Sequence, residues 1–265
     1  MRPLNSSVYQ YKTLSCTILG LRSDNYTYML RDEDTGKVLV IDPSETKPVI
    51  QWLDDHHWTL DWILDTHHHH DHIEGNVGLK DRFQCKIAAP AYDIDHGRIT
   101  GKPDLALKDG DVFEFGSYKI RVITTPGHTL GHISLFVEGA HWLFSGDTLF
   151  SLGCGRLFEG TPVMLWESFQ KLLSLPDSTL VFCGHEYTLA NANFIDKTLP
   201  ALDGFKEFQE ELRDRLEREK KTIPSKLSDE KRFNPYFLTA DPRLSMFGQS
   251  ESEVFGKIRQ LKDNF

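Results

Sequence analysis

The chain lacks several features that would each point to a particular class of protein. No apolar run approaches the ~20 residues that a membrane-spanning helix needs. Residues 1–15 have no apolar core of a signal peptide. The four cysteines are scattered, without a CxxC pair or the density of a disulfide scaffold. These absences exclude a membrane-spanning or disulfide-stabilised protein, and we expect a reduced, cytoplasmic compartment.

Basic residues are also few, because 30 lysines and arginines stand against 39 aspartates and glutamates, which leaves a net charge of −9. Proteins that bind nucleic acid or anionic membranes need an excess of cations on the surface. We therefore expect neither partner. At 265 residues, with 39% hydrophobic content, the chain is long enough for one large globular domain with a smaller appendage.

The most informative motif is the heptapeptide at residues 66–72, THHHHDH, which contains five histidines and one aspartate. Imidazole and carboxylate groups are metal ligands, and each imidazole would need a polar partner in a core. In an extended segment, alternation places His67, His69 and Asp71 on one side, and a turn at His72 lets this residue join them. His68 and His70 fall on the other side. The spacing predicts a metal site.

Two simpler explanations of this motif fit less well. A purification tag would lie at a terminus and would not contain Asp71. A low-complexity metal-scavenging tract would not be flanked by strand and turn signals, whereas residues 62–64 are apolar and precede the motif directly.

Strand patterns dominate the first two-thirds of the chain, and helical patterns dominate the rest. The short apolar or alternating segments predict strands at 37–43, 62–66, 85–89, 118–123, 132–137 and 142–145. Helical spacing of apolar residues predicts helices at 47–57, 205–221 and 253–262. Strands mixed with helices indicate packed sheets with helices outside. We place a domain boundary between residues 186 and 187, which makes residues 187–265 a helical appendage.

Three further polar residues follow predicted strands, each with a neighbouring glycine: His128, Asp147 and His185. A single histidine or aspartate at a strand end is more often a turn residue than a ligand. Three of them beside the heptapeptide favour one site, because functional groups collect on strand-end loops.

Several blocks together resemble glyoxalase II (hydroxyacylglutathione hydrolase), a family of the metallo-β-lactamase superfamily. The similarity covers nearly the whole chain. The blocks are THHHHDH with Gly-Asn at 75–76, TPGHT at 125–129, GDTLF at 146–150, GCGRLFEGT at 153–161, GHEYT at 184–188 and RxxKDxF at 259–265. The resemblance implies an α+β fold: a metallo-β-lactamase-like αββα sandwich over residues 1–186, followed by a small C-terminal α-helical domain over residues 187–265.

The resemblance also implies roles for individual residues. One metal ion would be bound by His67, His69 and His128, and the second by Asp71, His72 and His185. Asp147 would bridge the two ions. Among these ligands, Asp71, His72 and Asp147 would take part most directly in catalysis. Substrate would contact Arg156, Phe158, Tyr187, Arg259 and Lys262. For Arg259 and Lys262 alone, a helix C-terminus that offsets its dipole is an equal alternative.

The implied reaction is hydrolysis of S-(2-hydroxyacyl)glutathione, such as S-D-lactoylglutathione, to glutathione and D-lactate, the second step of methylglyoxal detoxification. Two divalent cations can lower the pKa of a shared water from 15.7 toward ~7, and the resulting metal-bound hydroxide would attack the thioester. Zinc is the first choice for these ligands, and iron and manganese accept the same set. We expect a monomer that acts on a small molecule.

Two positions depart from the family pattern. Phe158 stands where some members carry tyrosine, so a hydroxyl contact to the substrate is absent. Glu74 replaces a common glycine and adds a negative charge near the metal ligands.

The nearest rival is a persulfide dioxygenase of the same superfamily, which uses one iron, but the segments at 157–160 and 259–262 favour the thioesterase. A β-lactamase would require export, and a nuclease would require a basic surface. A protein without catalytic activity that has kept the fold is the rival from another class. Such proteins usually lose ligands, and here none is missing.

Overall fold

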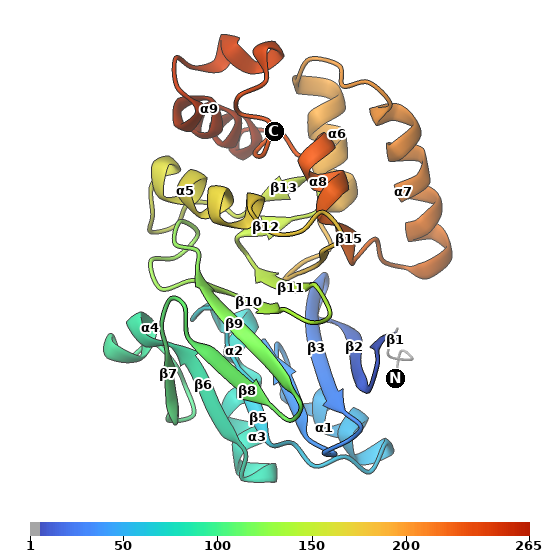
Figure 1. Ribbon diagram of the computed structural model, residues 1–265, viewed down its shortest axis with the longest axis vertical. Helices are drawn as coiled ribbons and strands as arrows, with labels where there is room; N and C mark the ends of the chain where they lie inside the picture. The colour runs from blue at the N-terminus through green and yellow to red at the C-terminus, as the bar shows by residue number, and fades with distance from the viewer. Residues whose placement is uncertain (1–5) are drawn as a thin grey trace. The chain divides into compact units, whose positions relative to one another are not determined.

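The computed structural model describes residues 6–265 and divides into two compact units (Figure 1). The first unit comprises the chain up to residue 124 together with residues 131–140. The second comprises residues 125–130 and 141–265. None of the described helices is long and apolar enough to cross a membrane. The sequence predicts no definite structure for residues 1–14; of these, residues 1–5 lie outside the described residues, and Ser6–Tyr11 form strand β1.

The first unit contains a seven-stranded sheet in which the strands lie in chain order. The pairs from β1 to β4 are antiparallel, and the pairs from β4 to β7 are parallel. Parallel neighbours need long crossover connections, which the helices supply. The strands are β1 (Ser6–Tyr11), β2 (Leu14–Leu21), β3 (Asn25–Asp32), β4 (Val38–Ile41), β5 (Trp62–Leu64), β6 (Lys86–Pro90) and β7 (Leu105–Leu107).

Four helices lie between the parallel strands, and two of them bury an apolar face. Val49 and Leu53 of α1 and Leu79 of α3 are fully buried in one cluster with Val40 and Ile63 of the sheet. The four-residue spacing of Val49 and Leu53 places them on one side of α1, as the sequence predicts. The helices are α1 (Thr46–Asp55), α2 (His70–Ile73), α3 (Gly75–Phe83) and α4 (Ala91–Asp95).

The first unit ends with three antiparallel strands, β8 (Val112–Phe115), β9 (Tyr118–Thr124) and β10 (Ile133–Val137). In the second unit, β11 (Trp142–Gly146) pairs in parallel with β14 (Leu180–Cys183), and β14 pairs with β15 (Ser225–Lys226). A separate hairpin consists of β12 (Leu149–Phe150) and β13 (Gly153–Cys154). The predicted strands are confirmed to within a few residues at their ends.

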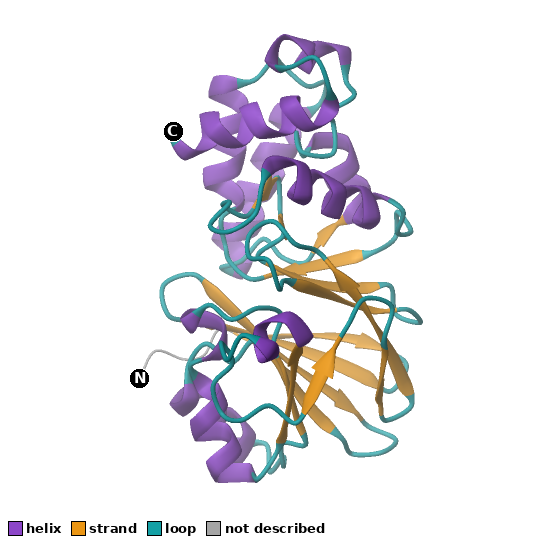
Figure 2. Ribbon diagram, turned by 90° about the vertical axis from the view of Figure 1, so that its left-hand side faces the viewer, coloured by secondary structure: helices purple, strands orange, loops and turns teal. Residues whose placement is uncertain are grey.

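Helices predominate in the second unit after β14 (Figure 2). Aromatic side chains form much of its core, where Phe169 of α5 packs edge-on against Phe255 of α9, and Tyr236 packs on Phe255. The predicted helices at 205–221 and 253–262 are confirmed as α7 and α9. The helices are α5 (Pro162–Leu173), α6 (Thr188–Thr198), α7 (Phe205–Glu219), α8 (Leu227–Phe233), the 3₁₀ helix η1 (Pro242–Phe247) and α9 (Glu251–Asp263).

Candidate metal centre

The histidine-rich segment follows β5 in the first unit, and its backbone differs from the prediction. The chain bends at residues 66–67, His69 is extended, and helix α2 begins at His70, so Asp71 and His72 lie on a helical turn. The predicted extended conformation of residues 67–71 is therefore wrong in its second half. His67 and His69 retain the two-residue spacing, and their ring centroids are 4.7 Å apart. The helical turn brings the His72 ring to 4.2 Å from that of His67.

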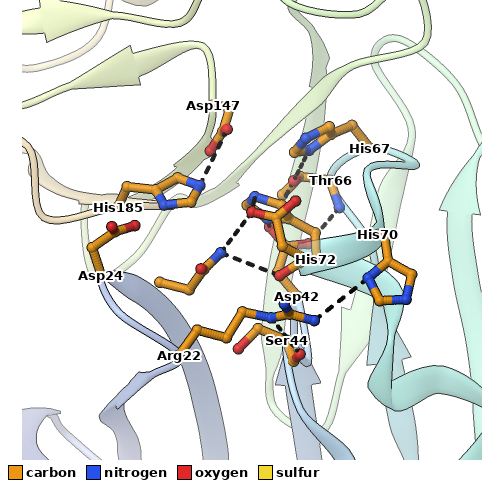
Figure 3. A network of polar contacts seen from close by, with 12 residues as sticks. Arg22, Asp24, Asp42, Ser44, Thr66, His67, His70, His72, Asp147 and His185 are labelled. Carbon is orange, nitrogen blue, oxygen red and sulfur yellow. Dashed lines mark hydrogen bonds and ion pairs between the residues drawn. The ribbon is translucent and has the colours of Figure 1, made fainter.

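Asp42, at the end of β4, orients two of these histidines. Its Oδ2 lies 2.9 Å from His72 Nδ1 and also accepts a 2.7 Å hydrogen bond from the Thr66 hydroxyl. Since that hydroxyl donates its proton to Asp42, it accepts from Nδ1 of His67 at 3.1 Å. Both histidines thus carry the proton on Nδ1. Figure 3 shows Asp42 and Thr66 beside His67 and His72.

Asp71 is oriented by Asn25, the first residue of β3. The Asn25 amide donates to Asp71 Oδ2 at 2.9 Å and to the Asp71 carbonyl oxygen at 3.2 Å. Asn25 is buried, whereas the Asp71 side chain is about one-third exposed. The hydrogen bonds from Asn25 therefore hold the Asp71 carboxylate in place, while part of the side chain remains accessible to solvent.

The remaining histidines of the segment have partners of their own. His68 pairs with the buried Asp93 at 3.1 Å, and His70 Nδ1 lies 3.5 Å from the guanidinium of Arg22. The same guanidinium forms an ion pair with Glu74, and Figure 3 shows Arg22 next to His70. The extra negative charge of Glu74 is thus compensated by Arg22.

In the second unit, His128 and His185 approach the same carboxylate oxygen. The Nε2 atoms of His128 and His185 each lie 3.4 Å from Oδ2 of Asp147, and all three residues are buried. Figure 3 shows Asp147 and His185 facing each other. His128 donates through Nδ1 to the Arg156 carbonyl oxygen at 2.8 Å. The His185 ring stacks on Tyr187, with a centroid distance of 4.9 Å.

Glycines allow this close approach, as the sequence pattern indicates. Gly146 precedes Asp147 with a φ of +48°, in the left-handed region that favours glycine. A Cβ atom at Gly155 would lie 1.9 Å from the Asp147 carbonyl oxygen and 3.0 Å from His128 Nδ1. A larger residue at position 155 would therefore displace the Asp147 backbone or the His128 side chain.

The donor groups of both units fit a divalent metal ion. His67, His72 and His128 each have Nδ1 engaged by a protein oxygen, which leaves Nε2 as the acceptor nitrogen, the arrangement typical of metal-ligating histidines. Nitrogen and oxygen ligands at ~2.0–2.1 Å from a tetrahedral ion lie ~3.3 Å from each other. The 3.4 Å separations around Asp147 match that spacing.

A pocket of about 400 Å³ opens in the second unit beside His128 and Asp147. The five residues predicted to contact substrate all line it. They are Arg156, Phe158, Tyr187, Arg259 and Lys262. Phe158 is 63% exposed, and its ring meets that of His128 edge-on. The pocket thus joins three cationic side chains to two of the predicted metal ligands.

The cations near the end of α9 also contact groups outside the helix. Arg259 Nη1 donates to the Cys154 carbonyl oxygen at 2.9 Å, and Nη2 binds Asp263 at 2.9 Å. Lys262 Nζ donates to the Ala190 carbonyl oxygen at 2.9 Å. Burial, assisted by the charge of Arg259, lowers the pKa of Lys262 to about 8. Both side chains are thus tied to groups outside α9, and a role in offsetting the helix dipole remains the alternative.

The sequence reasoning missed Asp42 and Asn25. A signal for Asp42 was present, because it follows an apolar strand in the same way as Asp147. Its φ of +49° is uncommon for a residue with a side chain, and such strain clusters at functional sites. Asn25 offers no comparable signal, since only the pairing of distant strands brings it to Asp71.

Comparison with known proteins identifies the family. Residues 22–185 match the family model of the metallo-β-lactamase superfamily, and residues 186–265 match the model described as hydroxyacylglutathione hydrolase C-terminus. The chain belongs to the hydroxyacylglutathione hydrolase family. The predicted fold class and the predicted enzyme class, a thiolester hydrolase, are confirmed. The division into domains at residue 186 and the roles of individual site residues remain predictions.

Individual relatives agree with this assignment. Hydroxyacylglutathione hydrolase from Methylococcus capsulatus is 44% identical over 91% of this chain and 95% of that protein. The protein of the same name from Rhizobium etli is 40% identical over 96% of this chain and 100% of that protein. Among solved structures, ETHE1 from Myxococcus xanthus is 25% identical with a TM-score of 0.63, over 96% of this chain and 89% of that chain.

Proposed function

We propose that this enzyme hydrolyses the thioester of S-(2-hydroxyacyl)glutathione, with S-D-lactoylglutathione as the substrate that yields glutathione and D-lactate. This reaction would be the second step of methylglyoxal detoxification. Two divalent ions, with zinc as the first choice, would be held by the seven predicted ligands: His67, His69, Asp71, His72, His128, Asp147 and His185. The names of the relatives and the C-terminal family match support the substrate class.

The observation that carries the proposal is the lining of the 400 Å³ pocket. A glutathione thioester has two carboxylates at one end and the reacting carbonyl at the other. Arg156, Arg259 and Lys262 provide cations for the carboxylates, and an arginine can bind both oxygens of one carboxylate through its planar fork. His128 and Asp147 line the same pocket, so a substrate bound through its carboxylates would extend toward metal ligands.

In the reaction, water adds to the thioester carbonyl carbon, the C–S bond breaks, and the sulfur leaves as a thiolate that takes up a proton. A pair of divalent cations, when bound, supplies the nucleophile by lowering the pKa of water and stabilises negative charge on the carbonyl oxygen. Asp71, held by Asn25, would orient the attacking water. The leaving thiol has a pKa of ~8.5, so the reaction needs no strong general acid.

The direct test is hydrolysis of S-D-lactoylglutathione by the purified protein, before and after chelation, with zinc, iron and manganese added back separately. We expect turnover that chelation abolishes and that metal restores, and the three metals can then be ranked. Absence of turnover with every metal would overturn the proposal. Oxygen uptake with glutathione persulfide would then identify the persulfide dioxygenase instead.

A further inference from the structure

The hairpin formed by β12 and β13 follows the predicted metal ligand Asp147 directly. Each of its strands has only two residues. So short a hairpin has little stability of its own. Its conformation must therefore depend on what packs against it, and in the second unit the C-terminal helices provide those contacts.

Side chains from helices α6, α8 and α9, and from Asn234 directly after α8, bind one backbone group of every residue from 150 to 154. The Asn191 amide of α6 donates to the Ser151 carbonyl oxygen at 3.0 Å. Glu230 of α8 accepts from the Leu152 N–H at 2.8 Å. Asn234 donates to the carbonyl oxygens of Phe150 and Gly153 at 3.3 and 3.1 Å. Arg259 of α9 donates to the Cys154 carbonyl oxygen at 2.9 Å.

Asn234, directly after α8, is the centre of this network. Its side chain is fully buried, and its Nδ2 also donates to Glu230 at 3.0 Å, while Oδ1 accepts from the Tyr236 N–H at 3.1 Å. Carbonyl oxygens can only accept, and a backbone N–H can only donate, so these partners fix which end of the amide is Nδ2 and which is Oδ1. The two hydrogens of Nδ2 are shared among three acceptors.

Hydrogen bonds at both ends of the hairpin connect it to the predicted ligands Asp147 and His128. The Ser145 hydroxyl donates to the Leu149 carbonyl oxygen at 2.7 Å, which closes the turn that contains Asp147. On the other side, Gly155 N–H donates to the Thr148 carbonyl oxygen at 3.1 Å. The next residue, Arg156, accepts the Nδ1 hydrogen bond of His128.

We propose that the C-terminal helices position the metal ligands Asp147 and His128 through the 149–154 hairpin, with Asn234 as the principal positioning residue. This inference rests on the proposed metal centre. It assigns the helical region a role in metal affinity in addition to the contacts of Arg259 and Lys262 with substrate. Removal of the Asn234 amide takes away the side-chain donor that holds two carbonyl groups of the hairpin, so the hairpin loses its tie to the end of α8 and can shift.

The test measures the affinity of the metal-depleted full-length protein for Zn²⁺ in competition with a chromophoric chelator. We expect Asn234→Ala to bind Zn²⁺ roughly 10–100-fold more weakly than the unmodified protein, as removal of residues that orient metal ligands does. The matched control is Asn193→Ala, which removes the same side chain from α6, where it accepts only from Gln209 and Arg213. This control should retain the original affinity.

Two more variants keep the test decisive if Asn234→Ala does not fold. Asn191→Ala removes one contact to the hairpin and should weaken Zn²⁺ binding by a smaller factor. Glu230→Gln keeps an oxygen that can accept from Leu152 and should bind Zn²⁺ as the unmodified protein does. A protein with a purely structural network would lose thermal stability in these variants without a change in Zn²⁺ affinity.

The outcomes separate the inference from the proposed function. If the unmodified protein binds Zn²⁺ and the folded Asn234→Ala and Asn191→Ala variants bind it equally tightly, the inference is overturned and the metal centre stands. If the unmodified protein binds no Zn²⁺, iron or manganese, the metal centre itself is overturned, and the inference with it.

Discussion

Asp42 Oδ2 lies 2.9 Å from His72 Nδ1, and both side chains are buried. The same carboxylate accepts a hydrogen bond from the Thr66 hydroxyl. This hydroxyl in turn accepts a hydrogen bond from His67 Nδ1. One acidic residue outside the predicted ligand set therefore fixes the tautomer of two histidines within it. We therefore expect metal binding by the histidine segment to depend on this residue as well as on the predicted ligands.

Replacement of Asp42 by Asn should weaken metal binding without removing a ligand. The amide has only one accepting oxygen for the Thr66 N–H, the Thr66 hydroxyl and His72, so His67 and His72 lose their fixed orientation. We expect a loss of roughly 10–100-fold in Zn²⁺ affinity, measured by chelator competition. Asp54→Asn, which alters an exposed ion pair with Arg82, is the control and should behave as the original protein.

Asp147→Ala should reduce the metal content and the rate of thioester hydrolysis together. The carboxylate oxygen that faces both His128 and His185 is lost, and the two imidazoles no longer have a common anionic partner. Metal analysis after dialysis should show less than the two ions expected for the unmodified protein. Full metal content together with undiminished turnover would contradict the assignment of Asp147 as a bridging ligand.

Lys262 should make substrate binding pH-dependent. Its pKa of about 8, lowered by burial and by Arg259, means that the ammonium is charged below pH 8 and neutral above it. Attraction for a substrate carboxylate is therefore lost as the pH rises through 8, and KM should increase while kcat is affected little. Lys262→Arg, which stays charged, should keep KM low at pH 9.

The role of Lys262 in substrate binding can also be tested at neutral pH by substitution. Lys262→Ala should raise KM about 10-fold, since a hydrogen bond to a charged group is lost, and its KM should no longer change near pH 8. Lys206→Ala, an exposed lysine on α7, is the control. If KM is unchanged in Lys262→Ala, the lysine serves only the contact with Ala190.

Phe158→Tyr should improve substrate binding. The Phe158 ring lines the pocket and is 63% exposed, so a hydroxyl group at its edge has room and can reach a peptide group of the substrate. A neutral hydrogen bond of this kind would lower KM by roughly 2–10-fold with little change in kcat. Steady-state kinetics with S-D-lactoylglutathione checks this, and a higher KM would show that the apolar contact with His128 matters more.

The first unit should become less stable in acid as the Asp32 carboxylate is protonated. Burial raises the pKa of this carboxyl group, but hydrogen bonds from the Ser117 N–H and the Thr35 hydroxyl outweigh burial and lower its pKa below the usual 3.8. Stabilisation by a carboxylate with a depressed pKa is present above the unfolded-state pKa and disappears as the pH falls through the folded-state pKa.

Asp32→Asn should consequently lower the free energy of unfolding by about 1–3 kcal/mol at pH 7, as measured by urea denaturation. The difference from the unmodified protein should shrink below about pH 4, where the carboxyl group of the unmodified protein becomes protonated. Asp34→Asn, at an exposed neighbouring position, is the matched control. A difference that stays constant down to pH 2 would contradict a lowered pKa of Asp32.

The sequence by itself determined the ligand types and their places at strand ends. His128, Asp147 and His185 each follow a strand in the structure, because alternation, apolar runs and glycines are local signals that govern local backbone conformation. The same local logic failed within residues 67–71, where helix α2 replaces the expected extended chain. The sequence did not show that the extended chain gives way to a helix at His70.

Only the tertiary structure decided what holds those ligands in place. Asp42 reaches His72 across 30 positions of sequence, and Asn234 reaches the carbonyl oxygens of Phe150 and Gly153 across more than 80. A buried carboxylate or amide takes whichever donors and acceptors the packing of distant strands and helices brings within hydrogen-bonding distance. A local sequence pattern cannot determine these partners, because they are set by the free-energy cost of leaving any buried polar group without a hydrogen bond.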